Sequence, residues 1–138
     1  MKNLLLILFF ISGHISFSQN NAVDFNTLVV KDGLYYYKNN KKPYTGQCYT
    51  LYKSGEKGLG GNIKNGKKDG DWIWWYKNGT KKRFAHYVDG MLDGKSTFWY
   101  KNGNKKSEII FSENRNIRQI SYNEKGKRIA NPSFSKFH

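Results

Sequence analysis

The stretch "DWIWWYKNGTKK", residues 71–82, places three tryptophans within four positions and follows them with a lysine-rich turn. The chain then reads "KSTFWYKNGNKK" at residues 95–106, which is 24 residues later. Both stretches run from aromatic residues to Lys-Asn-Gly and on to a pair of lysines. Self-similarity at a fixed interval is typical of repeat proteins, so this interval decides the fold class.

The same 24-residue interval relates tyrosines, glycines and lysines elsewhere in the chain. A weaker fourth copy begins at Tyr122, two residues early. Five independent series at one period indicate a repeat whose units stack on their neighbours. The series are Tyr52, Tyr76 and Tyr100; Gly46, Gly70 and Gly94; Gly55, Gly79 and Gly103; Lys53, Lys77 and Lys101; and Lys57, Lys81 and Lys105.

Each unit consists of two similar halves, and each half has an aromatic residue before an Asn-Gly or Asp-Gly turn. These dipeptides favour tight hairpins because both central residues tolerate positive φ, and Asp32-Gly33 in "TLVVKDGLYYYK" predicts an N-terminal hairpin. Between the turns, polarity alternates with period two: Trp72, Trp74 and Tyr76 point one way, while Ile73 and Trp75 point the other. No window has a helical period. We therefore expect an all-β fold, in which antiparallel β-hairpins form an elongated, twisted meander or solenoid sheet of 24-residue double repeats.

Residues one period apart are expected to stack, which predicts an aromatic ladder through the sheet. Offset ring pairs stabilise by roughly 0.5–1.5 kcal/mol each beyond burial. The same alignment puts Cys48 in line with Trp72 and Ser96, which favours a buried thiol over an exposed one that pairs between chains. The predicted structural aromatic ladder comprises Tyr52, Trp74, Trp75, Tyr76, Phe98, Trp99 and Tyr100.

Residues 1–18 have one cation and then an apolar run from Leu4 to Ile11, which is too short to span a bilayer. This pattern is typical of a cleaved signal peptide; the alternative is a buried N-terminal helix. We expect export to the periplasm or the extracellular space, with no transmembrane segment after cleavage. The predicted organisation is a signal peptide at 1–18, a flexible leader at 19–27, a repeat domain at 28–130 and a disordered tail at 131–138.

The chain is strongly basic, with 24 lysines and arginines against 10 acidic residues and a net charge of +14. Such a charge predicts attraction to polyanions and acidic surfaces. The cations concentrate after the 24-spaced tyrosines, where a stacked meander would align them along one edge. The alternative is that these lysines only solvate turns and protect the sheet from aggregation. The candidate basic edge comprises Lys53, Lys57, Lys77, Lys81, Lys82, Arg83, Lys101, Lys105 and Lys106.

Candidate catalytic residues are few. Beyond the expected signal peptide, the histidines are His86 and His138, and the only cysteine is Cys48. None of these residues has a partner at metal-ligand or nucleophile spacing. We therefore expect no enzymatic activity, no cofactor and no metal.

Three segments resemble the variant MORN repeat: "YKNNKKPYTG", "IKNGKKDGDWIWWYKNG" and "YVDGMLDGKSTFWYKNG". The shared core is an aromatic residue, a glycine-containing turn, and then Gly-x-Trp/Phe-x-x-aromatic. The resemblance covers about residues 34–128 and departs at 111–128, where the turn, expected at residues 114–116, has no glycine. It implies a β-hairpin array that acts in scaffolding and protein contact, in some cases with affinity for acidic lipids. Many exported proteins of this type carry an antitoxin label.

Two functions remain open at this stage. The first is an exported, non-enzymatic interaction module, antitoxin-like or part of an envelope scaffold, that docks an acidic protein partner. The second is a charge-driven binder of anionic lipid or glycan at the cell envelope. Nucleic acid would suit the charge and the aromatic residues, but the expected export argues against it.

Overall fold

The computed structural model describes residues 22–131, which form twelve strands and one short 3₁₀ helix. The elements are β1 (Val23–Asp24), η2 (Phe25–Thr27), β2 (Leu28–Lys31), β3 (Leu34–Tyr37), β4 (Gly46–Leu51), β5 (Lys57–Lys64), β6 (Lys67–Trp75), β7 (Lys81–Val88), β8 (Met91–Leu92), β9 (Gly94–Trp99), β10 (Lys105–Ser112), β11 (Arg115–Tyr122) and β12 (Arg128–Ile129).

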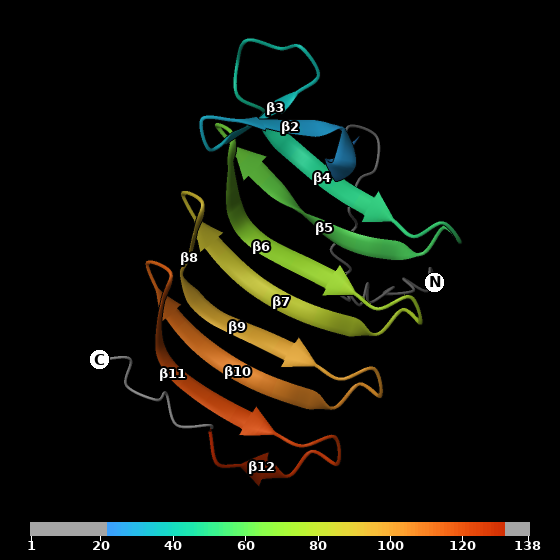
Figure 1. Cartoon of the computed structure of the whole chain (residues 1–138), viewed down its shortest axis with the longest axis vertical. Coiled ribbons are helices and arrows are strands. Elements are labelled where there is room, and N and C mark those ends of the chain that lie inside the picture. Colours follow the sequence, from blue (N-terminus) through green and yellow to red (C-terminus); the bar gives the residue numbers. More distant parts are fainter. Residues whose placement is uncertain (1–21, 132–138) are drawn as a thin grey trace, which may run out of the picture.

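Ten of these strands form one open sheet in the order β1-β4-β5-β6-β7-β9-β10-β11-β12, with β8 paired to β7 (Figure 1). From β4 onward the pairing is antiparallel, and successive strands are joined by hairpins. Strands β2 and β3 form a separate hairpin that turns at Asp32 and Gly33, as predicted. The predicted all-β class and the hairpin-linked antiparallel arrangement are confirmed.

The turns at one end of the sheet are tight because two consecutive residues have positive φ. In the turn between β5 and β6, φ is 50° at Asn65 and 79° at Gly66. The turn between β10 and β11 has φ of 48° at Glu113 and 65° at Asn114. The sequence predicted this glycine-free turn at residues 114–116, which is wrong by one position. Asparagine tolerates the left-handed region, so the loss of glycine does not open the hairpin.

The turns at the other end begin at the 24-spaced tyrosines. The N–H of Tyr76 donates to the carbonyl of Thr80 at 2.8 Å, and Tyr52 and Tyr100 begin turns of the same kind. The fourth such turn begins at Asn123, whose N–H donates to Lys127 at 2.9 Å. Tyr122, where the weaker fourth copy is predicted to begin, is the last residue of β11 and lies one position before the turn.

The core lies at the N-terminal end of the sheet, on the side that carries Trp72. Cys48, Ile63 and Trp72 are at most 1% exposed and contact one another, which confirms the predicted burial of the thiol. The indole N–H of Trp72 donates to the carbonyl of Asn62 at 3.1 Å. Gly61 lies directly against the indole ring, because a Cβ built there would be 2.2 Å from it. The core is therefore thin, because the Trp72 indole packs directly against the backbone at Gly61.

Part of the predicted leader, residues 19–27, has a defined structure. Val23 and Asp24 form β1, which pairs in parallel with β4, and Phe25 and Val23 pack on the core. The Asp24 carboxylate caps η2 by accepting from the N–H of Asn26 at 2.9 Å. The folded region therefore begins before residue 28. The predicted signal peptide at 1–18 and residues 132–138 of the predicted tail lie outside the described residues.

Within residues 22–131, no helix has both the length and the apolar character needed to cross a bilayer.

Candidate binding surfaces

The predicted ring stacking within the aromatic ladder is wrong. Within residues 22–131, Trp74 is the only ladder residue in a ring pair, and its partner is Trp72 at 5.9 Å between centroids. The reason is that β7 lies between β6 and β9, so positions one period apart are separated by two strand spacings. That separation is about 9–10 Å, whereas ring pairs need about 4.5–7 Å.

Hydrogen bonds connect the ladder tyrosines to a strand further along the sheet instead. Each half-buried phenol group donates to a main-chain carbonyl near the end of the strand that precedes the following turn. Such a bond stabilises a fold by about 0.5–1.5 kcal/mol and fixes the ring against the sheet. The donor and acceptor pairs are Tyr52 to Trp75, Tyr76 to Trp99 and Tyr100 to Tyr122, each at 2.9 Å.

The predicted basic edge lies where the turns after β4, β6 and β9 lead into β5, β7 and β10, along one side of the sheet (Figure 1). All of its lysines are exposed, while Arg83 is half-buried and belongs to a different surface. Some of these lysines cover the tyrosines at their own turns: the ammonium of Lys82 is 5.7 Å from the Tyr76 ring, and that of Lys106 is 5.6 Å from the Tyr100 ring. These contacts are consistent with cation–π attraction at an exposed site.

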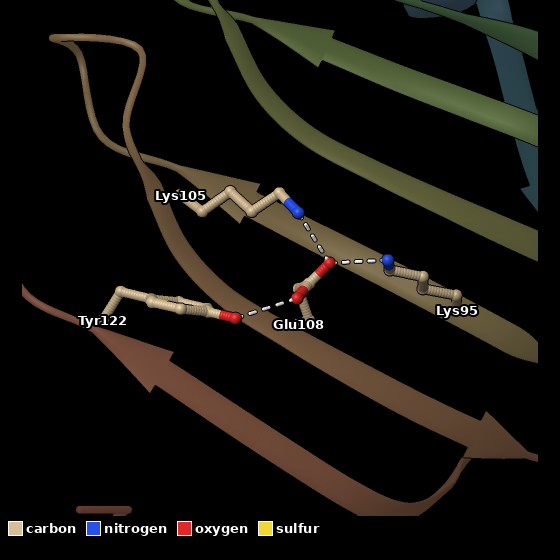
Figure 2. Close-up of polar contacts among 4 residues, drawn as sticks. All are labelled: Lys95, Lys105, Glu108 and Tyr122. Atoms are coloured by element: carbon tan, nitrogen blue, oxygen red, sulfur yellow. Dashed lines mark hydrogen bonds and ion pairs between the residues drawn. The ribbon is translucent and has the colours of Figure 1, made fainter. Parts of the chain in front are cut away.

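Lys105, another predicted edge residue, takes part in an ion-pair cluster around Glu108 (Figure 2). The Glu108 carboxylate contacts the ammonium groups of Lys95 at 2.5 Å and Lys105 at 3.0 Å. It also accepts a hydrogen bond from the phenol of Tyr122 at 3.0 Å. These donors lower the pKa of Glu108 to about 2, the bond from Lys95 being the largest cause. The charge of Lys105 is therefore partly neutralised within the chain.

Arg83 leaves the predicted edge and projects from the sheet between two aromatic rings. Its register partners are Trp74 on β6 and Phe98 on β9, so all three side chains lie on one face. The guanidinium carbon is 4.8 Å from the Trp74 ring centroid and 5.1 Å from that of Phe98. Its Nε is buried and has no hydrogen-bond partner among the described residues. We call this side of the sheet, which also carries Trp72, the Trp72 face.

Lys68 is a second cation on the Trp72 face, and sequence reasoning missed it. Its ammonium lies among four rings: 4.6 Å from Trp72, 5.3 Å from Tyr87, 5.5 Å from Trp74 and 5.6 Å from Phe25. Burial lowers the pKa of Lys68, and the nearby charge of Arg83 lowers it further. Strand alternation could have revealed it, because positions 68, 72 and 74 share one face of β6. The contact between Lys68 and the Phe25 ring of η2 could not have been predicted in this way.

A hollow of about 260 Å³ opens beside Lys68, at the end of the sheet opposite the basic edge. Aromatic side chains and turn glycines form its walls, and two lysines contribute its charge. The lining residues are Gly33, Tyr35, Gly66, Lys67, Lys68, Tyr87 and Gly90.

The carboxylates of the chain do not neutralise the Trp72 face. All ten acidic side chains lie within the described residues. Their ion pairs are with Lys67, His86, Lys95 and Lys105, and in residues 22–131 none is with Lys68 or Arg83. His86, predicted to have no catalytic role, lies 2.7 Å from the carboxylate of Asp71.

In the described part of the chain, no group of three or more His, Cys, Asp or Glu side chains is placed to hold a metal. Comparison of the chain with models of known protein families, with curated proteins and with solved structures finds no match.

Proposed function

We propose that the protein is an exported, non-enzymatic binding module for an acidic protein partner. The observation that carries this proposal is the Trp72 face, where Lys68 and Arg83 lie among aromatic rings without a carboxylate partner from residues 22–131. Aromatic residues and arginine are the side chains most enriched at protein interfaces, and a net charge of +14 favours an acidic partner.

We also propose that the chain is built from 24-residue double repeats of the MORN-like type, with an antitoxin-like or envelope-scaffold role. The equivalent turns at Tyr52, Tyr76 and Tyr100 support a repeat, as do their matching phenol–carbonyl bonds. A repeated hairpin array offers an extended surface whose length suits a protein partner.

The alternative function is charge-driven binding of anionic lipid or glycan at the cell envelope. The exposed lysines of the basic edge favour it, because Lys53, Lys77 and Lys101 lie at equivalent turns along one side of the sheet. Within residues 22–131 their side chains make no ion pair and no ring contact, so their charge is available to a polyanion.

Salt dependence separates the two functions. The immobilised protein is incubated with proteins of an envelope fraction, with phosphatidylglycerol–phosphatidylcholine vesicles and with an acidic polysaccharide, at about 0.15 and 0.5 M NaCl. If the function is a packed protein interface, one envelope protein should bind in a fixed ratio to the immobilised chain and stay bound at the higher salt. Vesicles and polysaccharide should then be released at the higher salt. Retention of only vesicles or polysaccharide, lost at the higher salt and abolished by replacing Lys53, Lys77 and Lys101 with alanine, would favour the alternative.

The proposed export has a separate test. Expression of the full chain in a bacterium is expected to give a mature protein that begins at or near Gln19, outside the cytoplasm. Recovery of intact Met1 in a cytoplasmic fraction would contradict export and would make nucleic acid a candidate partner again.

A further inference from the structure

The Trp72 face holds two cations, Lys68 and Arg83, that have no carboxylate partner among residues 22–131. The Lys68 ammonium has three N–H donors, and the four rings around it offer only their faces. The Nε of Arg83 is buried without a partner in the described part of the chain. Within residues 22–131 neither cation is paired with a carboxylate, and Lys68 lines a hollow, so its charge is available to an acidic group from outside the chain.

Both cations contact the Trp74 ring, Lys68 at 5.5 Å and Arg83 at 4.8 Å from its centroid, and they are close enough for the charge of Arg83 to lower the pKa of Lys68. Their like charges repel each other, and a negative group between them would relieve that repulsion. Arg83 lies between the rings of Trp74 and Phe98, and its Nε is buried, so a ligand would meet the edge formed by its two terminal nitrogens. A carboxylate fits that edge with two parallel hydrogen bonds.

The surroundings indicate a carboxylate carried by a peptide. The hollow beside Lys68 admits a group that continues beyond the charge, and Tyr35 and Tyr87 line it. Aromatic walls of this kind pack against a side-chain stem or a peptide backbone, whereas a free inorganic anion would leave them exposed to water.

We propose that Lys68 and Arg83 form a carboxylate-binding site on the Trp72 face, in which an Asp or Glu side chain of a protein partner is held between the two cations. The site rests on the proposed function, since it assigns the contact that recognises the acidic partner. It differs from the predicted basic edge, which lies at the opposite end of the hairpins from the hollow.

The test is a titration of the full chain, followed by tryptophan fluorescence, because Trp72 and Trp74 contact Lys68 directly. The probes are a short oligoglutamate peptide, the matching oligoglutamine peptide, sodium acetate and sodium phosphate. We expect saturable binding of oligoglutamate, none of oligoglutamine, and acetate and phosphate binding at least tenfold weaker. Equal or tighter binding of acetate or phosphate would overturn the assignment to a peptide carboxylate.

Variants locate the site. Lys68→Met and Arg83→Met each keep the length of the side chain and remove its charge, and each is expected to weaken oligoglutamate binding by about tenfold or more. Lys101→Met removes the same charge at the exposed edge and is the matched control, with an expected change below about twofold. Equal losses in all three variants would show that net charge drives binding, and unchanged binding in Lys68→Met would overturn the site.

Folding is checked separately from binding. The melting temperature of Lys68→Met is expected to be unchanged or higher, because the variant no longer desolvates an ammonium. If Arg83→Met does not fold, Arg83→Lys takes its place, because it keeps the charge and loses the planar guanidinium group. We expect Arg83→Lys to bind oligoglutamate more weakly than the wild-type chain. Wild-type affinity would show that the planar guanidinium is not needed. Retention of an envelope protein at high salt by the wild-type chain, and equally by Lys68→Met and Arg83→Met, would refute the site but would not contradict the proposed function. No retention by the wild-type chain would refute the function itself.

Discussion

Gly60 and Gly61 are adjacent in β5 and face opposite sides of the sheet, so they give a matched pair of substitutions. A Cβ at Gly61 would lie 2.2, 2.4 and 2.7 Å from three carbons of the Trp72 indole. A Cβ at Gly60 would lie 3.7 Å from Trp75, which is an ordinary van der Waals contact. Neither glycine has positive φ, so backbone strain does not separate the two variants.

The expected cost of Gly61→Ala follows from what must move. The new Cβ is fixed to the backbone, so the fully buried indole of Trp72 must shift, and overpacking of this kind costs about 1–3 kcal/mol. The shift also breaks the bond from the indole N–H to Asn62, which contributes about 1 kcal/mol. We therefore expect Gly61→Ala to lower the free energy of unfolding by about 3 kcal/mol. Gly60→Ala should leave it unchanged or raise it by up to about 1 kcal/mol, because alanine is the better strand residue.

The assay is urea unfolding of the full chain, monitored by tryptophan fluorescence and by circular dichroism. With an m-value of about 1.5 kcal/mol/M, a loss of about 3 kcal/mol lowers the urea midpoint by about 2 M. A loss of that size is a large part of the free energy of unfolding of a domain of this size. Similar midpoints for Gly60→Ala and Gly61→Ala would mean that Trp72 does not lie on Gly61, and the described core would be wrong.

Three further predictions concern single side chains. Tyr76→Phe removes the bond to the Trp99 carbonyl and should cost about 1 kcal/mol in urea unfolding, whereas a cost near zero would show that the phenol points to solvent. Burial raises the pKa of Cys48 from 9.0 to about 12, so the thiol should resist alkylation at pH 8 until the protein unfolds, and the stability that it contributes should fall only as pH rises above about 9. The lowered pKa of Glu108, about 2 against 4.5 for a free side chain, contributes stability above pH 4.5 that is lost as pH falls toward 2. Glu108→Gln should therefore remove about 1–2 kcal/mol at pH 7, after allowance for solvent screening, and flatten the acid limb of a pH–stability curve.

The local features of the fold could be predicted from sequence because they depend on neighbouring residues. Polarity alternation gave the faces of β6, and Asp-Gly gave the hairpin at Asp32 and Gly33. The absence of stacking in the aromatic ladder could not be predicted from the period, because the pairing order places β7 between β6 and β9 and Arg83 between Trp74 and Phe98. The packing of η2 on the core also depends on distant residues, since no pattern in residues 22–27 specifies that Phe25 contacts the ring of Trp72.

The candidate site shows the same limit. The positions of the exposed turn lysines could be predicted because they follow the tyrosine period. The four rings around Lys68 come from three separate elements, η2, β6 and β7, and only the folded chain brings them together. A cation that is ordinary in the sequence therefore becomes a candidate site through tertiary packing.

Hydrogen–deuterium exchange of the full chain with and without oligoglutamate tests most directly whether the Trp72 face, and not the basic edge, is the binding surface. We predict slower exchange confined to β6 and β7, residues 67–75 and 81–88, which contain Lys68 and Arg83. Slower exchange at the turns 52–56, 76–80 and 100–104, with β6 and β7 unchanged, would place the ligand on the basic edge and contradict the central claim.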